Sequence, residues 1–299
     1  MKEEDGSKPS MRRLYALLCL MVFFWALNFV IARIALKEIP PLLAASLRAM
    51  LAGVLLLPLY WWKGRELDQQ RWTSRDLPML LILGAIGVSG NQIFFLSGLD
   101  RTSTGHASVL LGLTPLMVLL IAAAMGQEPL TARRILGMSV ALGGIGVLQL
   151  SRGGGAHATL AGDVLILAAG ATFAAFTVIG KRLTKRHGGL TVNTFAYLGG
   201  GVFLLPVVAW HWERFSFSGV SVPAWLSLLY MAAFPSALCY LIFYYALTHI
   251  PASRVSSFGY LQPVMATALG VMFLGDVISS SLVAGGSLVL TGVYLTERS

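Results

Sequence analysis

The stretch Leu111-Gly-Leu-Thr-Pro-Leu-Met117 and the later stretch Tyr260-Leu-Gln-Pro-Val264 decide how this chain is built. When the sequence is slid along itself by 148 residues, Pro115 meets Pro263, and no gap is needed from the first apolar run to the last. The same offset aligns other like residues: Arg33 with Lys181, Pro58 with Pro206, Trp62 with Trp210, Ser108 with Ser256, Glu128 with Asp276 and Gly137 with Gly285. We therefore predict two repeats, at residues 14-151 and 160-299, after an N-terminal segment at residues 1-13.

The composition indicates that both repeats lie in a membrane. Of the 299 residues, 56% are hydrophobic and 12% are charged, against about 25% charged in an ordinary soluble domain. A spanning helix needs roughly 20 apolar residues. Runs of about that length fall at residues 14–36, 41–62, 77–99, 104–125, 135–150, 160–181, 191–212, 222–247, 251–274 and 280–296. The sequence thus predicts an all-α membrane protein with ten transmembrane helices.

Five spans per repeat is an odd number, so the second repeat must enter the membrane inverted relative to the first. Lysine and arginine gather in the loops on the side of both termini. The opposite side holds only Arg33, Lys37, Arg101, Arg152 and Arg214. Because basic loops stay in the cytoplasm, both termini are predicted to be cytoplasmic. Two inverted five-helix repeats are typical of secondary transporters.

The net charge of +9 does not indicate a nucleic-acid binder, because the basic residues lie between apolar runs rather than in a tail or on one face. Cys19 and Cys239 lie inside apolar runs and provide neither a disulfide framework nor a four-cysteine zinc site. We expect no metal, no cofactor and no nucleic acid. The expected partners are a small-molecule substrate and the lipid bilayer, and we expect the chain to function as a monomer.

Matching helix breaks in the two halves point toward a binding site, because irregular backbone at membrane depth persists only where it is buried in protein or lines a cavity. Pro115 and Pro263 form one such pair, and Gly87 and Pro235 form a second. A simple kink satisfied by neighbouring helices is the alternative for each residue.

Polar residues deep in apolar runs are costly unless they face the interior of the bundle. With the aromatic residues near them, they define a predicted substrate cavity in spans one, three, four, six, eight and nine. Its predicted members are Trp25, Asn28, Asn91, Phe94, Phe95, Ser108, Phe173, Phe176, Thr177, Tyr240, Tyr244, Ser256, Ser257 and Tyr260. For each Ser, Thr or Asn, an interhelical hydrogen bond is the alternative role.

Few charged or titratable side chains lie near these spans. Arg48 is the sole basic residue in the middle of a span, where it costs about 2.5–3.5 kcal/mol unless it is paired or solvated. Two roles stay open for it: binding a substrate carboxylate, or a structural contact with carbonyls or headgroups. His106, near the start of span four, could titrate with transport. Glu128 and Asp276 precede spans five and ten, and we expect them to cap those helices.

Spans five and ten carry the small residues that let helices approach closely. These are Gly137, Ala141 and Gly144 in the fifth span and Gly285, Gly286 and Gly292 in the tenth. We expect close helix packing there and a peripheral position for both spans.

Three regions resemble the drug/metabolite transporter superfamily. They are Phe24-Trp-Ala-Leu-Asn-Phe-Val-Ile-Ala-Arg33, the stretch from Leu111 to Met117 followed by Gln127-Glu-Pro-Leu-Thr131, and the stretch from Tyr260 to Val264 followed by Leu274-Gly-Asp-Val277. Within the superfamily the chain looks like the ten-span EamA-type exporters, and most like the bacterial aromatic amino-acid exporters. The resemblance covers nearly the whole chain and implies a multi-pass protein of the bacterial cytoplasmic (inner) membrane. The chain lacks the paired Lys/Arg site of the phosphate-exchanging relatives.

The resemblance implies export of amino acids, preferentially aromatic or bulky apolar ones, by alternating access. ATP hydrolysis is not expected, because no G-x-x-x-x-G-K-[ST] loop occurs. The alternative within transport is a multidrug or other small-metabolite exporter. An intramembrane enzyme is disfavoured, because the sequence has no H-E-x-x-H, no G-x-S-x-G and no embedded pair of aspartates.

Overall fold

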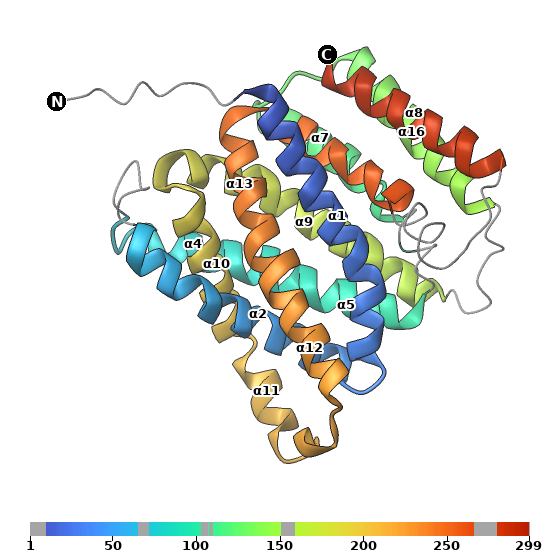
Figure 1. The fold of residues 1–299 in the computed structure, drawn as a ribbon. Helices are drawn as coiled ribbons and strands as arrows, with labels where there is room; N and C mark the ends of the chain where they lie inside the picture. Colours follow the sequence, from blue (N-terminus) through green and yellow to red (C-terminus); the bar gives the residue numbers. More distant parts are fainter. Residues whose placement is uncertain are drawn as a thin grey trace.

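A computed structural model of the chain describes residues 10–64, 72–102, 107, 110–150, 159–265 and 280–298. Every regular element in these ranges is helical, which confirms the predicted all-α class (Figure 1). The first half contains α1 (Met11–Leu36), α2 (Pro41–Leu59), η1 (Tyr60–Gly64), α4 (Leu77–Leu83), η2 (Gly84–Gly90), α5 (Asn91–Arg101), α7 (Thr114–Ala124) and α8 (Ala132–Leu150). The second half contains α9 (Leu160–His187), α10 (Gly189–Phe203), α11 (Leu205–Trp212), η3 (Phe217–Gly219), α12 (Val222–Met231), η4 (Ala232–Leu238), α13 (Cys239–His249), α14 (Ala252–Ser257), η5 (Phe258–Tyr260) and α16 (Ser280–Glu297).

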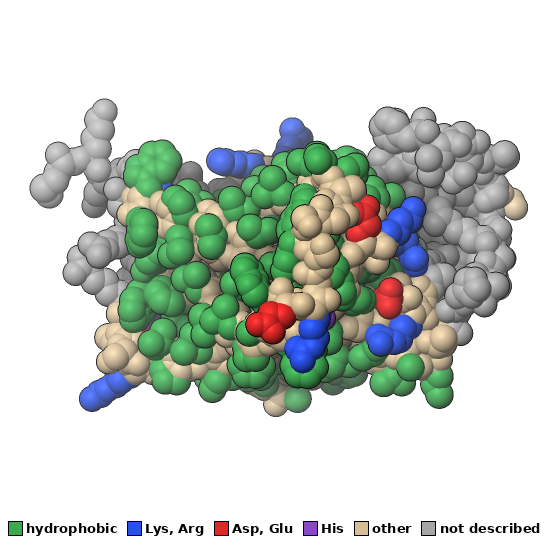
Figure 2. Space-filling view, turned by 90° about the horizontal axis from the view of Figure 1, so that it is seen from below, with side chains coloured by type: hydrophobic (Ala, Val, Ile, Leu, Met, Phe, Trp, Pro, Cys, Tyr) green, Lys and Arg blue, Asp and Glu red, His purple; other side chains and the backbone are tan. Residues whose placement is uncertain are grey.

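Several of these helices are long and apolar enough to cross a membrane. Five qualify singly: Met11–Leu36, Pro41–Gly64, Leu77–Arg101, Leu160–His187 and Val222–His249. A sixth is formed by α10 and α11 together, which meet at a bend of 42°. Hydrophobic side chains are spread over much of the described face in Figure 2, with Lys, Arg, Asp and Glu side chains between them. The chain is thus a multi-pass membrane protein, and the count of ten spans stays a prediction.

The helices α8 and α16 lie side by side at one edge of the molecule, which confirms the close packing and the peripheral position expected from their small residues (Figure 1). Gly292 and Gly144 make the contact possible, because no side chain separates the two backbones there. A Cβ on Gly144 would lie 2.7 Å from the carbonyl oxygen of Gly285 and 2.7 Å from the amide nitrogen of Val289. These distances are shorter than real Cβ contacts, so the pairing of α8 with α16 depends on the glycine.

We predict that Gly144→Ala forces α8 and α16 apart and lowers the midpoint of thermal unfolding in detergent. The matched control is Gly143→Ala on the next residue, where an added Cβ has no neighbour within 4 Å. That control should keep the parental midpoint or raise it, because alanine is favoured over glycine in a helix by about 0.8–1.0 kcal/mol. Equal midpoints for the two variants would contradict the packing described above.

Two helix breaks stand at equivalent places in the halves. The π-helical segments η2 and η4 cover residues 84–90 and 232–238, so they coincide when the chain is moved by 148 residues. Each segment makes a side-chain hydrogen bond to another helix. Ser89 Oγ donates to the carbonyl of Gly200 at 2.9 Å, and Trp25 Nε1 donates to that of Pro235 at 3.1 Å. The breaks are therefore held by contacts with other helices.

A hydrogen bond between two helix ends also occurs at equivalent places in the halves. It joins α1 to the end of α5 in the first half and α9 to the end of α13 in the second. Arg33 Nη2 donates to the carbonyl of Thr102 at 2.9 Å, and Lys181 Nζ donates to the carbonyl of Ile250 at 3.3 Å. Both members of the second pair lie 148 residues after those of the first. The same contact, between residues far apart in the sequence, thus occurs in both halves.

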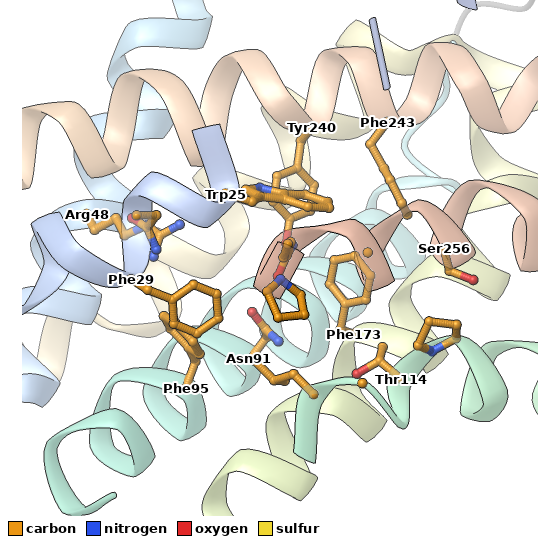
Figure 3. Close-up of a pocket in the computed structure, with 17 residues that line it drawn as sticks. Trp25, Phe29, Arg48, Asn91, Phe95, Thr114, Phe173, Tyr240, Phe243 and Ser256 are labelled. Atoms are coloured by element: carbon orange, nitrogen blue, oxygen red, sulfur yellow. The ribbon is translucent and has the colours of Figure 1, made fainter. Parts of the chain in front are cut away.

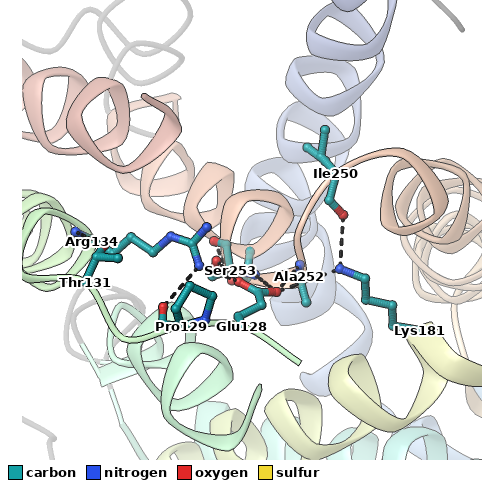
Figure 4. A network of polar contacts seen from close by, with 9 residues as sticks. Glu128, Pro129, Thr131, Arg134, Lys181, Ile250, Ala252 and Ser253 are labelled. Atoms are coloured by element: carbon teal, nitrogen blue, oxygen red, sulfur yellow. Dashed lines mark hydrogen bonds and ion pairs between the residues drawn. The ribbon is translucent and has the colours of Figure 1, made fainter. Parts of the chain in front are cut away.

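Glu128 connects the halves in a way that corrects the expectation that it caps the helix following it. Its Oε1 accepts from the backbone N–H of Ala252 at 2.6 Å and of Ser253 at 3.3 Å, and its Oε2 accepts from the Ser253 hydroxyl (Figure 4). Arg134 Nη1 lies 3.1 Å from Oε2, and Lys181 Nζ lies 3.8 Å from Oε1. The carboxylate therefore caps α14 of the second half rather than α8, because free amides at a helix start attract an anion from any direction. Asp276, its equivalent in sequence, lies outside the described residues.

A second carboxylate of the first half binds the start of a helix in the second half. Glu38, between α1 and α2, accepts from the amide and the hydroxyl of Ser221, each at 2.6 Å. Ser221 is the N-cap residue of α12. These hydrogen bonds lower the pKa of the Glu38 carboxyl, because they stabilise its charged form.

Replacing Glu128 with glutamine should destabilise the contact between the halves. The variant keeps the shape of the side chain but places an NH₂ group where the carboxylate accepts, and it leaves Arg134 and Lys181 without their counter-charge. Because hydrogen bonds to a charged group are worth about 1.5–3 kcal/mol, we expect a clearly lower midpoint of thermal unfolding. Glu213→Gln, the same change on an exposed residue, is the control, and an equal effect of both changes would count against the capping role.

Candidate functional site

A cavity of about 130 Å³ lies between the two halves and is lined by residues of both (Figure 3). The helices α1, α2 and α5 of the first half and α9, α13 and α14 of the second contribute side chains to it. The chain around Pro115 and Pro263 completes the lining, together with Leu111, Gly112 and Gly259. The cavity therefore lies where the two repeats meet and where both interrupt their helices.

The irregular backbone at the cavity follows from the two prolines. Pro115 stands in the first turn of α7, where its missing N–H has no intrahelical partner to lose, and two turn residues precede the helix. In the second half the short 3-10 helix η5 precedes Pro263. Gly87 and Pro235, the other predicted pair, lie in η2 and η4 and do not line the cavity.

Aromatic rings form much of the cavity wall. Trp25 is central, with its ring centroid 5.8 Å from that of Phe173, 5.9 Å from that of Tyr240 and 5.9 Å from that of Phe243. Most of these contacts are edge-to-face or tilted, which are favourable arrangements for aromatic pairs. On another side of the cavity Phe29 meets Phe95 at 5.7 Å. The hydrogen bond from Trp25 to the carbonyl of Pro235 fixes the indole in this cluster.

Polar groups interrupt the aromatic wall. Asn91 Nδ2 donates to the carbonyl of Ala169 at 2.9 Å, while Asn28 Oδ1 and Thr114 Oγ1 are buried without a hydrogen-bond partner among the described residues. Ser256 Oγ donates to the carbonyl of Ser253 at 3.0 Å and can still accept. A molecule in the cavity would thus meet hydrogen-bonding groups among apolar rings, the usual composition of a small-molecule site.

Arg48 brings a positive charge to the cavity from α2. Its side chain is buried, at 5% exposure, and its Nε donates to Ser236 Oγ at 2.8 Å. None of the ion pairs among the described residues involves Arg48. Figure 3 shows it at the opposite end of the lining residues from Ser256 and Thr114.

The structure brings part of the predicted set to the cavity. The residues that line it are Trp25, Asn28, Asn91, Phe95, Phe173, Tyr240 and Ser256. The residues that do not are Phe94, Phe176, Thr177, Tyr244, Ser257 and Tyr260. Ser108 lies outside the described residues, as does His106. Phe176, for example, packs against Gly87, where an added Cβ would lie 1.7 Å from its ring.

The prediction missed other lining residues, among them Phe29, Phe243 and Thr114. Helical spacing alone did not separate Phe243 from Tyr244, because residues three and four positions after Tyr240 share almost one face. The repeat offset would have done so, since Phe243 lies 148 residues after Phe95 and Gln262 lies 148 residues after Thr114. Among the described residues, no three His, Cys, Asp or Glu side chains gather as metal ligands.

The fold and the cavity define a class: helical membrane transporters whose cavity lies between two like halves. The EamA-like transporter family model matches residues 12–150 and again residues 160–298. The chain belongs to this family, which is part of the drug/metabolite transporter superfamily, and it is a membrane transporter.

Named relatives agree with this assignment. An uncharacterized transporter of Archaeoglobus fulgidus is 29% identical, covering 95% of this chain and 98% of the relative. A probable terminal-alkyne amino-acid exporter of Streptantibioticus cattleyicolor is 30% identical over 94% of this chain and 92% of its own length. A crystal structure with 19% identity covers 96% of this chain and 97% of the solved one with a TM-score of 0.77, which shows the same fold. The family and these relatives are transporters, which favours transport over an intramembrane enzyme.

Proposed function

We propose that this transporter exports amino acids with aromatic or bulky apolar side chains across the bacterial inner membrane. The observation that carries the proposal is the cluster of Trp25, Phe173, Tyr240 and Phe243 on the cavity wall. Leucine or valine would fill such positions equally well if they only had to exclude water. Aromatic side chains bind an aromatic ligand better than aliphatic ones do, because a stacked aromatic ligand gains about 0.5–1.5 kcal/mol beyond burial of its surface.

The polar groups of the cavity suit the backbone end of an amino acid. Asn28 Oδ1 and Thr114 Oγ1 have no hydrogen-bond partner in the part of the chain that the structure describes, and both can accept from an ammonium group. Each such hydrogen bond involves a charged donor and is worth about 1.5–3 kcal/mol net. Contacts of this strength suit a transporter, which must release what it binds. The relative described as a probable amino-acid exporter supports the same substrate class.

The proposed mechanism is alternating access in a ten-span protein of two inverted repeats with both termini in the cytoplasm. Equivalent breaks and equivalent contacts in the two halves support it, because halves of like fold can exchange conformations and so open the cavity to either side. A multidrug exporter is the alternative function, since aromatic walls also attract organic cations.

Purified full-length chain in liposomes tests the proposal. Vesicles loaded with L-phenylalanine should lose it faster than protein-free vesicles, and L-leucine should compete better than L-serine. Ethidium is the probe for the multidrug alternative. Retention of phenylalanine together with release of ethidium would overturn the amino-acid proposal, and a chemical change in the lipids would favour an enzyme.

Neighbouring phenylalanines on α5 provide a sharper test of the cavity. Phe95 lines it, whereas Phe94 does not. We predict that Phe95→Leu lowers the preference for phenylalanine over leucine roughly two- to tenfold, because the ring contribution of about 0.5–1.5 kcal/mol is lost while apolar volume is kept. Phe94→Leu is the matched control and should keep the parental preference. The measurement is competition between the two amino acids in the liposome assay, and an equal shift in both variants would refute the placement of the site.

A further inference from the structure

Arg48 is a buried cation whose bonding is incomplete. A guanidinium carries five N–H donors, and among the described residues only the one on Nε has an acceptor, the Ser236 hydroxyl. The two Nη groups make no hydrogen bond with the described residues, and the side chain lines the cavity at 5% exposure. A charge at this depth in an apolar chain is costly unless another group satisfies it. None of the described residues that line the cavity is an Asp or a Glu.

We propose that the Nη groups of Arg48 bind the carboxylate of the transported molecule and thereby select for carboxylate-bearing substrates. This inference rests on the proposed function and names the chemical group that the same cavity recognises. The planar fork of a guanidinium matches the two oxygens of a carboxylate and binds them through charge-assisted hydrogen bonds. Because Nε is held by Ser236, the fork is oriented before the substrate arrives.

The charge at the site favours a monoanionic group. Arg48 is the only Lys or Arg among the residues described as lining the cavity. One positive charge balances one carboxylate, whereas a phosphate dianion would need a second cation. The same charge repels organic cations, which disfavours the multidrug alternative. The residue equivalent to Arg48 in the second half is Ala196, so the cation is a feature of one half only.

A purely structural role for Arg48 predicts different behaviour. If the residue served only to join α2 to η4 through Ser236, its loss would weaken every ligand equally, because the cavity as a whole would deform. If it binds the carboxylate, its loss must weaken only ligands that carry this group. The ratio of two affinities therefore separates the two roles.

The experiment measures binding to the purified full-length chain in nanodiscs by isothermal titration calorimetry. The probes are L-phenylalanine and L-phenylalaninamide, which differ in the carboxylate alone, and 3-phenylpropionate, which keeps the carboxylate but lacks the amine. We expect the parent chain to bind phenylalanine at least about tenfold more tightly than the amide. In Arg48→Gln the affinity for phenylalanine and phenylpropionate should fall about tenfold or more, while that for the amide changes less than about threefold.

Two further variants keep the result interpretable. Arg48→Lys retains the charge without the fork and should keep part of the preference for phenylalanine. Arg214→Gln removes the same charge from an exposed arginine outside the cavity, whose Cζ lies 3.8 Å from the ring centroid of Trp210. This control should leave the ratio of the affinities for phenylalanine and its amide unchanged. If Arg48→Gln does not fold, the parental ratio and the Arg48→Lys ratio decide the question.

The outcomes distinguish this inference from the proposed function. Equal affinity of the parent for phenylalanine and its amide, or equal loss of both in Arg48→Gln, would overturn carboxylate recognition even if phenylalanine is exported. Binding of phenylpropionate but not of phenylalanine would uphold the anion site and overturn the amino-acid proposal. Binding of none of the three probes would overturn both.

Discussion

A helix in lipid must find a partner inside the protein for every backbone donor and acceptor, and this constraint organises the whole molecule. Regular helices meet it alone, so each departure from a regular helix has to be satisfied by another element. In η4 the carbonyl of Pro235 accepts from Trp25 of α1, and that of Ala237 accepts from Asn193 of α10. The breaks therefore lie where helices of both halves converge, and the cavity lies there too.

The same constraint explains which parts of the fold could be predicted from the sequence. The length of the apolar runs and the repeat depend on composition and spacing, and the two π-helical segments coincide at the predicted offset. The partner of Glu128 could not be predicted this way. Its carboxylate caps α14, more than 120 residues away in the chain, and an anion is stabilised by any helix start within reach.

The sequence predicted most of the spans that line the cavity, but it predicted less well which face of each helix turns toward the cavity. Apolar residues surround a transmembrane helix, so hydrophobicity does not distinguish the side facing lipid from the side facing protein. Phe94 and Phe95 looked equivalent for this reason. Tyr244 and Tyr260, which were also predicted to line the cavity, lie in the packed core, and their hydroxyls have no hydrogen-bond partner within the described ranges. Only the packing of neighbouring helices decides which ring reaches the cavity.

The symmetry of the two repeats extends to the aromatic residues of the cavity but not to all of its polar residues. Some lining residues come in pairs separated by 148 residues, as Trp25 does with Phe173 and Phe95 with Phe243, so the aromatic frame is nearly symmetric. Arg48 and Asn91 have no polar equivalent, because Ala196 stands in the place of Arg48 and Cys239 in that of Asn91. In the proposed mechanism of alternating access, symmetric walls let either half close on the aromatic ring of the substrate. The proposed bond from Arg48 to the carboxylate keeps that end of the substrate with the first half, and it thereby orients the substrate while the two halves exchange conformations.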